Sequence, residues 1–154
     1  MTESTRRLVR ICIVAAVTFV VGKYAFRPMW IDGISMQPTY SGQGFNFCNR
    51  LAYLRHPPER GDVVMMRYGG DKWFLLKRVI AFAGETVEFR GGRCHVNGSP
   101  LDEPYVKLPC DWNEPPRKVA DGCIFVIGDN RSVRRDCHVG GEMRLSRLEG
   151  KAVW

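Results

Sequence analysis

The chain lacks the motifs of several large enzyme classes. None of its six cysteines forms a Cys-x-x-Cys pair and no His-Glu-x-x-His segment occurs, so the sequence predicts neither a zinc site nor a zinc metallopeptidase. Gly-x-Ser-x-Gly is also absent, and none of the three histidines lies in a motif with a partnering carboxylate. These absences disfavour a Ser-His-Asp hydrolase. Internal repeats are missing too, and 154 residues suffice for one domain.

Acidic residues are scarce. The chain has 16 Asp and Glu against 23 Lys and Arg, a net charge of +7 that is compatible with nucleic-acid binding. However, no RNA-binding signature or basic helix occurs, and the basic residues are scattered apart from two clusters. The clusters are Arg6, Arg7 and Arg10 before an apolar run, and Arg131, Arg134 and Arg135 in one predicted loop. We therefore expect no nucleic-acid partner, and the first cluster fits anionic lipid headgroups better.

A long uncharged apolar run is lacking as well. As a helix, Ile11 to Gly22 would span only about 18 Å, short of the roughly 30 Å hydrocarbon core of a bilayer. A helix from Leu8 to Phe26 would span about 28 Å, if Arg10 and Lys23 extend their charged ends toward the two interfaces. The sequence therefore predicts one N-terminal transmembrane helix.

A cleaved signal peptide is the alternative interpretation of this segment. It is disfavoured because no small-x-small cleavage site follows: Lys23 would occupy the minus-three position before Ala25. We expect residues 1–28 to form a cytoplasmic tip and an uncleaved anchor, and residues 29–154 to form an extracytoplasmic domain. The basic N-terminal side then faces the cytoplasm.

Past Trp30 the pattern is typical of β structure. Short apolar runs are broken by glycine, proline and Asn-Gly, and only the anchor has helical periodicity. Strands are predicted at 45–49, 61–67, 73–80, 86–90, 93–97, 123–127 and near 151–154. Residues 91–92, Gly-Gly, predict a tight hairpin turn. Leu101 to Val119 contains four prolines and is predicted to be a long loop.

Two residues are candidates for nucleophile and base. Ser35 lies in Asp-Gly-Ile-Ser-Met-Gln-Pro-Thr, residues 32–39, close behind the predicted anchor and therefore near the bilayer surface. A serine hydroxyl attacks well only when a neighbouring base takes its proton. Lys77 shares one face of a predicted strand with Trp73, Leu75 and Val79, and desolvation by such neighbours lowers a lysine pKa. A neutral Lys77 amine within about 2.6–3.2 Å of the Ser35 hydroxyl could serve as that base.

Gly128-Asp129-Asn130-Arg131 is the third element, and the three segments resemble type I signal peptidases in order and spacing. The resemblance implies a mainly β, antiparallel domain with an apolar surface on the membrane. It implies a serine endopeptidase that removes leader peptides from exported preproteins, bound in extended form, without a metal or cofactor. The implied location is the inner or cytoplasmic membrane, and contact with the export machinery is possible.

The resemblance also assigns roles. Ser35 is the implied nucleophile and Lys77 the implied general base. The backbone around Gly33 and Ser35 would support the oxyanion, and the segment with Asp129 and Asn130 would lie against the lysine. Arg78 and Asp136 are expected to form an ion pair beside the site.

Some positions depart from the family pattern. Gly33 carries no hydroxyl where some members have a serine that contacts the oxyanion. Arg134 stands where the family has the serine that orients the lysine, and Cys137-His138 replaces Ser-Arg. We expect Ser132 to supply the missing hydroxyl after a shift of the loop. These departures leave two alternatives open: an impaired, membrane-tethered relative that binds exported chains, and a specialised processing peptidase of a conjugation or secretion system.

Overall fold

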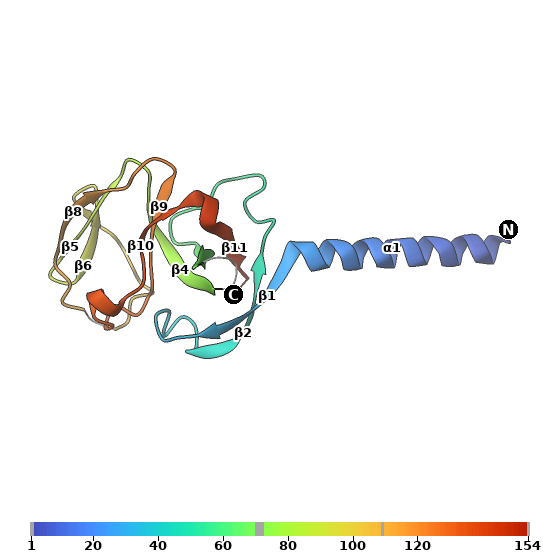
Figure 1. Cartoon of the computed structure of the whole chain (residues 1–154), viewed down its shortest axis with the longest axis horizontal. Helices are drawn as coiled ribbons and strands as arrows, with labels where there is room; N and C mark the ends of the chain where they lie inside the picture. Colours follow the sequence, from blue (N-terminus) through green and yellow to red (C-terminus); the bar gives the residue numbers. More distant parts are fainter. Residues whose placement is uncertain (1, 70–72, 109, 154) are drawn as a thin grey trace.

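One long helix projects from an all-β body in the computed structural model, which describes residues 2–69, 73–108 and 110–153 (Figure 1). Helix α1, Glu3–Ala25, begins behind Thr2, whose hydroxyl accepts a hydrogen bond from the Thr5 N–H. Its residues are exposed except Gly22, which is half-buried, and Ala25, which is buried, and the helix is long and apolar enough to cross a membrane. The helix thus begins earlier than the predicted Leu8 and ends one residue before Phe26. The predicted division at residue 28 stays a prediction.

Within the described residues, the strands form two antiparallel sheets. The larger has the order β1-β2-β11-β3-β4-β9-β10 and the smaller the order β7-β6-β5-β8. The larger sheet contains β1 Phe26–Asp32, β2 Gln43–Asn49, β3 Val63–Tyr68, β4 Trp73–Phe82, β9 Cys123–Ile127, β10 Gly141–Arg144 and β11 Leu148–Ala152. The smaller contains β5 Thr86–Arg90, β6 Arg93–Val96, β7 Ser99–Pro100 and β8 Glu114–Lys118. The predicted fold class, a mainly antiparallel β domain with one N-terminal helix, is confirmed.

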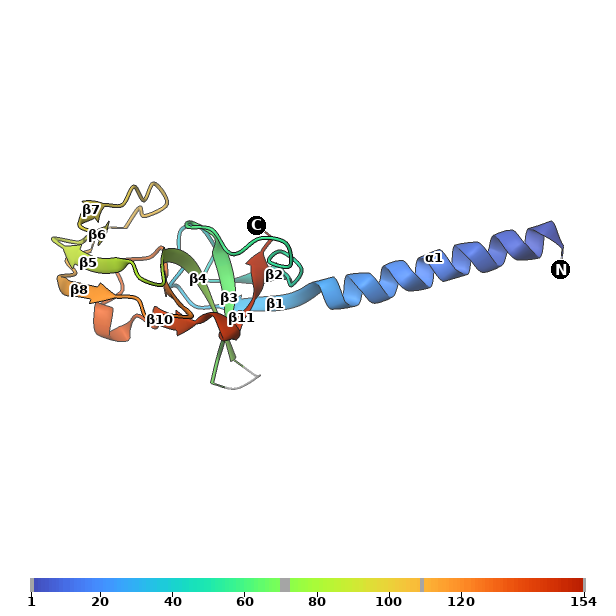
Figure 2. The same ribbon diagram turned by 90° about the horizontal axis from the view of Figure 1, so that it is seen from above.

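The two sheets lie at different distances from the helix. Figures 1 and 2 both show β1 and β2 beside the end of α1, with β5, β6 and β8 at the far end of the body. The predicted hairpin is confirmed in the far sheet, where Gly91 and Gly92 have φ of 54° and 79° as a tight type I′ turn requires.

Four strands were not expected from the sequence, and one of them, β7, has only two residues. β1 starts directly after the helix and contains Pro28, β10 is short, and β8 contains Pro115 and Pro116 inside the predicted loop. β8 lies at the edge of its sheet, where a strand can tolerate prolines because one side needs no N–H donor. Whether a strand lies at the edge of a sheet depends on the packing of the whole chain. The number of prolines alone therefore led to the wrong prediction of a loop for this segment.

Strand β9 and the second half of β4 are buried on both faces and join two cores. Ile80 and Ile127 pack with Val87 and Phe89 of the smaller sheet. On the opposite face, Val79 and its neighbours pack against β3 and β10. A strand covered on both sides has little freedom to move, so the ends of β4 and β9 are rigid supports for side chains.

All six cysteines are free thiols. Cys48, Cys94 and Cys123 are buried, and burial raises the pKa of Cys48 to about 11 and that of Cys94 to about 12. The thiols of Cys48 and Cys94 therefore stay protonated at neutral pH and act as small apolar side chains.

Candidate active site

Ser35 lies in the turn between β1 and β2, and the end of β9 holds this turn in place. The Asn130 backbone N–H donates to the Ser35 carbonyl over 3.0 Å, and the Asn130 side-chain amide donates to the Ile34 carbonyl over 3.0 Å. Met36, next to the serine, is buried at 2% exposure and anchors the turn in a small core. Asn130 therefore holds the serine turn, a contact that the sequence analysis did not predict, since it expected this segment against the lysine.

Lys77 meets Ser35 at the distance expected from the sequence. The Lys77 Nζ donates to the Ser35 Oγ over 2.6 Å. Lys77 lies in the middle of β4, opposite Val64 of β3, and only 3% of it is exposed. Burial lowers the pKa of Lys77 to about 8, against a smaller opposing effect of the Asp129 charge. At pH 7 about one lysine in ten is then neutral, compared with roughly one in 2,500 at an ordinary pKa.

Asp129 links the serine turn to β4. It is fully buried and accepts two hydrogen bonds from Arg78, from Nε over 2.8 Å and from Nη2 over 2.6 Å. The Thr39 hydroxyl donates to the same carboxylate from the turn that carries Ser35. Arg78 also donates to the Gly61 carbonyl over 2.6 Å and lies over the Tyr105 ring. This network holds Arg78, the residue next to Lys77, in place. Through Thr39 it also holds the turn that carries Ser35.

The predicted ion pair of Arg78 with Asp136 is wrong. Asp136 lies in the short 3₁₀ helix η1, Arg135–Cys137, and pairs with Arg134 over 2.6 Å, both side chains being mostly exposed. The correct acid is Asp129, because β9 pairs with β4 and Asp129 comes directly after Ile127-Gly128 at the end of β9. Arg134, which replaces the lysine-orienting serine of the family pattern, points outward.

Ser132 does not provide the expected hydroxyl for Lys77. Its Oγ donates to the Asn130 side-chain carbonyl over 2.6 Å, and its backbone N–H donates to the same atom over 3.2 Å. Ser132 therefore orients Asn130, and through Asn130 the serine turn. The prediction that it contacts the lysine is wrong.

Gly33 is open on the side where a side chain would be. A Cβ added to it would meet nothing within 4 Å, although its φ of +138° strains any other residue. Its backbone N–H already donates to the Gly42 carbonyl over 2.8 Å, so this donor is engaged. Gly33 thus shapes the entry to the site, and its role in supporting an oxyanion stays a prediction.

His138 is a buried neighbour of the site that the sequence interpretation dismissed for want of a partner. It is 4% exposed, and its ring packs edge-on against the Trp112 ring with 5.1 Å between the ring centroids. A Cβ on Gly128 would lie 2.1 Å from the Ser35 carbonyl oxygen and 2.9 Å from the His138 Nε2. Burial, followed by the charges of Lys77 and Arg131, lowers the pKa of His138 to about 3. Gly128 and Gly140 leave space for the imidazole ring. These two glycines were the feature of the sequence that could have indicated a buried His138.

A groove of about 540 Å³ runs between β1 and β4 and includes the dyad. Its wall comprises residues 27–33 with Ser35 and Met36 on one side, and Met65 with 73–77 on the other. Exposed Trp30 and Trp73 stand at this groove, at 69% and 71% exposure. The groove can take an extended chain along the two strands and bring one of its carbonyl groups to Ser35.

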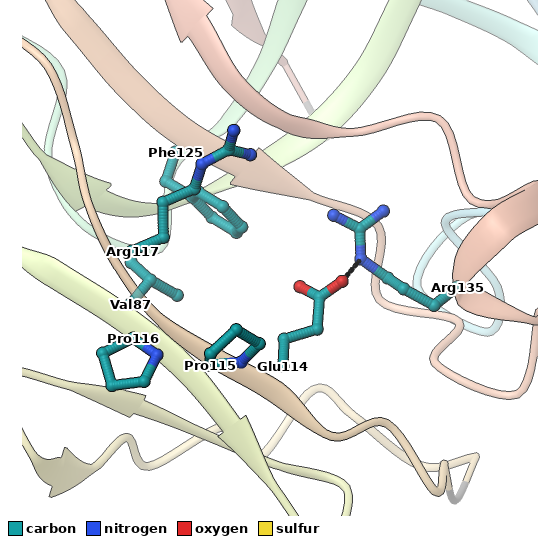
Figure 3. Close-up of a pocket in the computed structure, with 7 residues that line it drawn as sticks. All are labelled: Val87, Glu114, Pro115, Pro116, Arg117, Phe125 and Arg135. Carbon is teal, nitrogen blue, oxygen red and sulfur yellow. Dashed lines mark ion pairs between the residues drawn. The ribbon is translucent and has the colours of Figure 1, made fainter.

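A second hollow, of about 330 Å³, lies away from the dyad (Figure 3). Figure 3 shows Glu114 and Arg135 facing one another across it, with their ion pair at 2.8 Å between Oε1 and Nε. Pro115, Pro116 and Arg117, which follow Glu114 along β8, also line this hollow. The described residues that line this hollow include no serine, cysteine or lysine, so the groove is the better candidate for an active site. Within the described residues, no three His, Cys, Asp or Glu side chains are grouped to hold a metal ion.

Comparisons with known proteins identify relatives of this chain. The family model described as signal peptidase, peptidase S26, matches residues 4–154. The chain is 34% identical over 140 residues to a probable signal peptidase I-1 of Synechocystis, covering 85% of this chain and 71% of that protein. It is 32% identical over 143 residues to signal peptidase I S of Bacillus subtilis, covering 84% and 76%. A crystal structure of a signal peptidase I from Enterococcus faecalis superposes with a TM-score of 0.50 at 27% identity, covering 61% of this chain and 95% of that one.

Proposed function

Since this chain belongs to the signal peptidase family, peptidase S26, and is a serine endopeptidase, we propose that it removes signal peptides with Ser35 as nucleophile and Lys77 as general base. One observation carries the assignment of the dyad: a buried amine with a lowered pKa lies 2.6 Å from the only hydroxyl that Lys77 contacts among the described residues. A side chain that costs free energy to bury and that meets a serine in a groove is typical of a functional site.

The reaction proceeds in two halves. Neutral Lys77 takes the Ser35 proton while the Ser35 Oγ attacks the scissile carbonyl carbon, whose π electrons move to the oxygen. The Lys77 ammonium then gives its proton to the leaving amine, the C–N bond breaks and an acyl-enzyme remains. Water attacks this ester, Lys77 takes the water proton, and the Ser35 Oγ leaves with that proton as the carboxylic acid departs.

The oxyanion is stabilised by the backbone N–H of Ser35. A single such donor contributes several kcal/mol in acyl transfer. Gly33 has no hydroxyl to add, and its own N–H is engaged with Gly42. Asn130 holds the Ile34 and Ser35 carbonyls and so aims the N–H groups of this turn. Asn130, Ser132, Asp129 and Arg78 are thus positioning residues.

Helix α1 anchors the enzyme as a single span, with the β body on the extracytoplasmic side of the cytoplasmic or inner membrane. The length and apolar character of α1 support the anchor, and the Arg6, Arg7 and Arg10 cluster supports this orientation. The groove begins within a few residues of the helix end, so it lies where the cleavage site of a preprotein leaves the bilayer. The substrates are preproteins, and transient contact with the export machinery would deliver them.

A cleavage assay tests this proposal. The purified full chain in detergent receives a preprotein with small residues at minus one and minus three. We expect cleavage by the wild type and none by Ser35→Ala, with both proteins unfolding at the same temperature. If the wild type binds the preprotein as tightly as Ser35→Ala does but never cleaves it, the impaired-relative alternative is correct. A panel of general and conjugation-type leaders separates a broad enzyme from a specialised one.

A further inference from the structure

Three arginines converge on one buried carboxylate at the helix end of the body. Glu149 of β11 is only 6% exposed, and its Oε1 lies 3.2 Å from Arg27 Nη1 and 2.9 Å from Arg50 Nε. Its Oε2 lies 3.7 Å from Arg67 Nε. The three guanidinium side chains are 41% to 42% exposed. We refer to Arg27, Arg50, Arg67 and Glu149 as the arginine cluster.

The cluster carries excess positive charge in a fixed arrangement. Counted over these four side chains alone, three guanidinium groups share one carboxylate. Arg27 lies over the Phe74 ring at 4.3 Å, and Arg67 Nη2 donates to the Ser146 carbonyl over 2.7 Å. Because the guanidinium groups are already oriented by Glu149, an anion that binds them loses little side-chain freedom. Guanidinium groups match the geometry of phosphate oxygens.

The cluster lies at the level of the lipid headgroups. Helix α1 has 23 residues, so it is about 34 Å long and just exceeds the roughly 30 Å hydrocarbon core. The Arg50 backbone N–H donates to the carbonyl of Ala25, the last helical residue, over 2.8 Å. Arg27 is two residues further along the chain. Figure 1 shows β1 and β2 at this end of the body, and Lys23 in the last helical turn adds positive charge.

We propose that the arginine cluster binds the phosphate of an anionic phospholipid headgroup in the leaflet next to the β body. This inference rests on the membrane placement given under the proposed function. The height of the cluster favours a lipid over a free anion, because lipid phosphates are concentrated at this level. Arg27 and Phe74 also line the groove, so a bound lipid orders the wall of the groove nearest the membrane.

Lipid retention tests the proposal without any need for cleavage. The full chain carrying Ser35→Ala is placed in nanodiscs with equal phosphatidylcholine and phosphatidylglycerol, and retained lipids are counted by native mass spectrometry. We expect selective retention of phosphatidylglycerol. Arg50→Gln with Arg67→Gln lowers this preference about fivefold for each arginine removed, since each contributes about 1 kcal/mol. The matched control is Arg117→Gln, an exposed arginine on β8 at the far end of the body, and it leaves the preference unchanged.

A second variant covers the risk that the double variant misfolds. Glu149→Gln raises the charge of the cluster, so the preference for phosphatidylglycerol increases. Equal preference in the wild type, the double variant and Glu149→Gln overturns the proposal. Displacement of the lipid by millimolar inorganic phosphate also overturns it, because the site would then be one for a free anion, and displacement by a soluble preprotein would assign it to the substrate. Failure of cleavage alone, with lipid retention intact, refutes the proposed function and leaves the lipid site standing.

Discussion

The two sheets bury very different side chains. In the seven-stranded sheet, Lys77 and Asp129 are buried with their charges or polar atoms directed at the groove and its supporting turn. The four-stranded sheet instead packs Val87, Phe89 and Cys94 against the back of β4 and β9. Its arginines Arg90 and Arg117 lie at the surface, and its one buried charged residue, Glu88, pairs with the exposed Arg90 among the described residues. The seven-stranded sheet thus buries the polar groups of the site at a cost in stability. The four-stranded sheet mainly provides apolar contacts that keep β4 and β9 rigid.

This contrast predicts that equal substitutions in the two sheets have unequal effects. The largest is expected at the dyad. Lys77→Met keeps the length of the side chain but removes the base, so cleavage falls by at least about 10³-fold. The thermal unfolding temperature does not fall, because an apolar side chain replaces a buried amine. Steady-state cleavage and calorimetry check both, with Arg117→Gln as the far-sheet control, which cleaves normally.

The pH dependence follows from the same residue. The pKa of Lys77 is about 8 in the folded chain and about 10.5 in the unfolded chain. Cleavage therefore rises with pH through about 8. Between pH 8 and 10.5 the unfolded state binds more protons, so the free energy of unfolding increases with pH by up to about 3 kcal/mol, and the penalty for burying the lysine is fully present below pH 8. Denaturant titrations across this range should show the rise in the wild type and not in Lys77→Met. A flat wild-type curve would contradict the burial of Lys77.

Gly128→Ala has the next largest expected effect. The added methyl group would lie 2.1 Å from the Ser35 backbone carbonyl, which cannot yield as a side chain can. The serine turn must shift, and a shift of about 1 Å costs roughly 10²-fold in rate. The matched control is Gly44→Ala, where the methyl group meets only the Ser41 hydroxyl at 3.2 Å. Comparable losses in kcat for both variants would show that the turn is not held at Gly128.

Asp129→Asn tests the buried ion pair. It leaves Arg78 charged without its carboxylate and lowers the free energy of unfolding by about 3–5 kcal/mol. Glu88→Gln in the far sheet, whose carboxylate pairs with the exposed Arg90, should cost clearly less. Urea denaturation of the two variants compares them directly. A larger loss for Glu88→Gln would reverse the roles assigned to the two sheets.

Arg134→Ala has the smallest expected effect. Its side chain is 80% exposed and pairs only with Asp136 among the described residues. Cleavage should change by less than about twofold, because exposed ion pairs contribute little. If the variant changes the pH profile of kcat/KM, the charge of Arg134 acts on Lys77 during the reaction, contrary to this expectation.

The sequence predicted the contact between Ser35 and Lys77 and the hairpin, and it failed at contacts between strands. Ser35 and Lys77 could be predicted because each lies in a characteristic local segment, and the Gly-Gly turn demands a positive φ that few residues adopt. The partner of Arg78 could not be predicted in this way. Asp129 and Asp136 are both downstream acids, and only the pairing of β4 with β9 selects the first. Ser132 was misjudged for a different reason, since its hydroxyl donates to Asn130, only two residues away along the chain, and not to Lys77.

The local sequence therefore determined the family, the apolar N-terminal helix and the two side chains proposed as nucleophile and base, because these depend on residue types and on spacing along the chain. Tertiary packing alone decided that the Lys77 amine is dry, that Asp129 holds Arg78, that His138 is enclosed beside Gly128, and that three arginines share Glu149 near the helix end. The reason is physical: desolvation and ion pairing depend on which distant segments a strand meets. That choice is made by the register of the sheet and by the core on either side of β4.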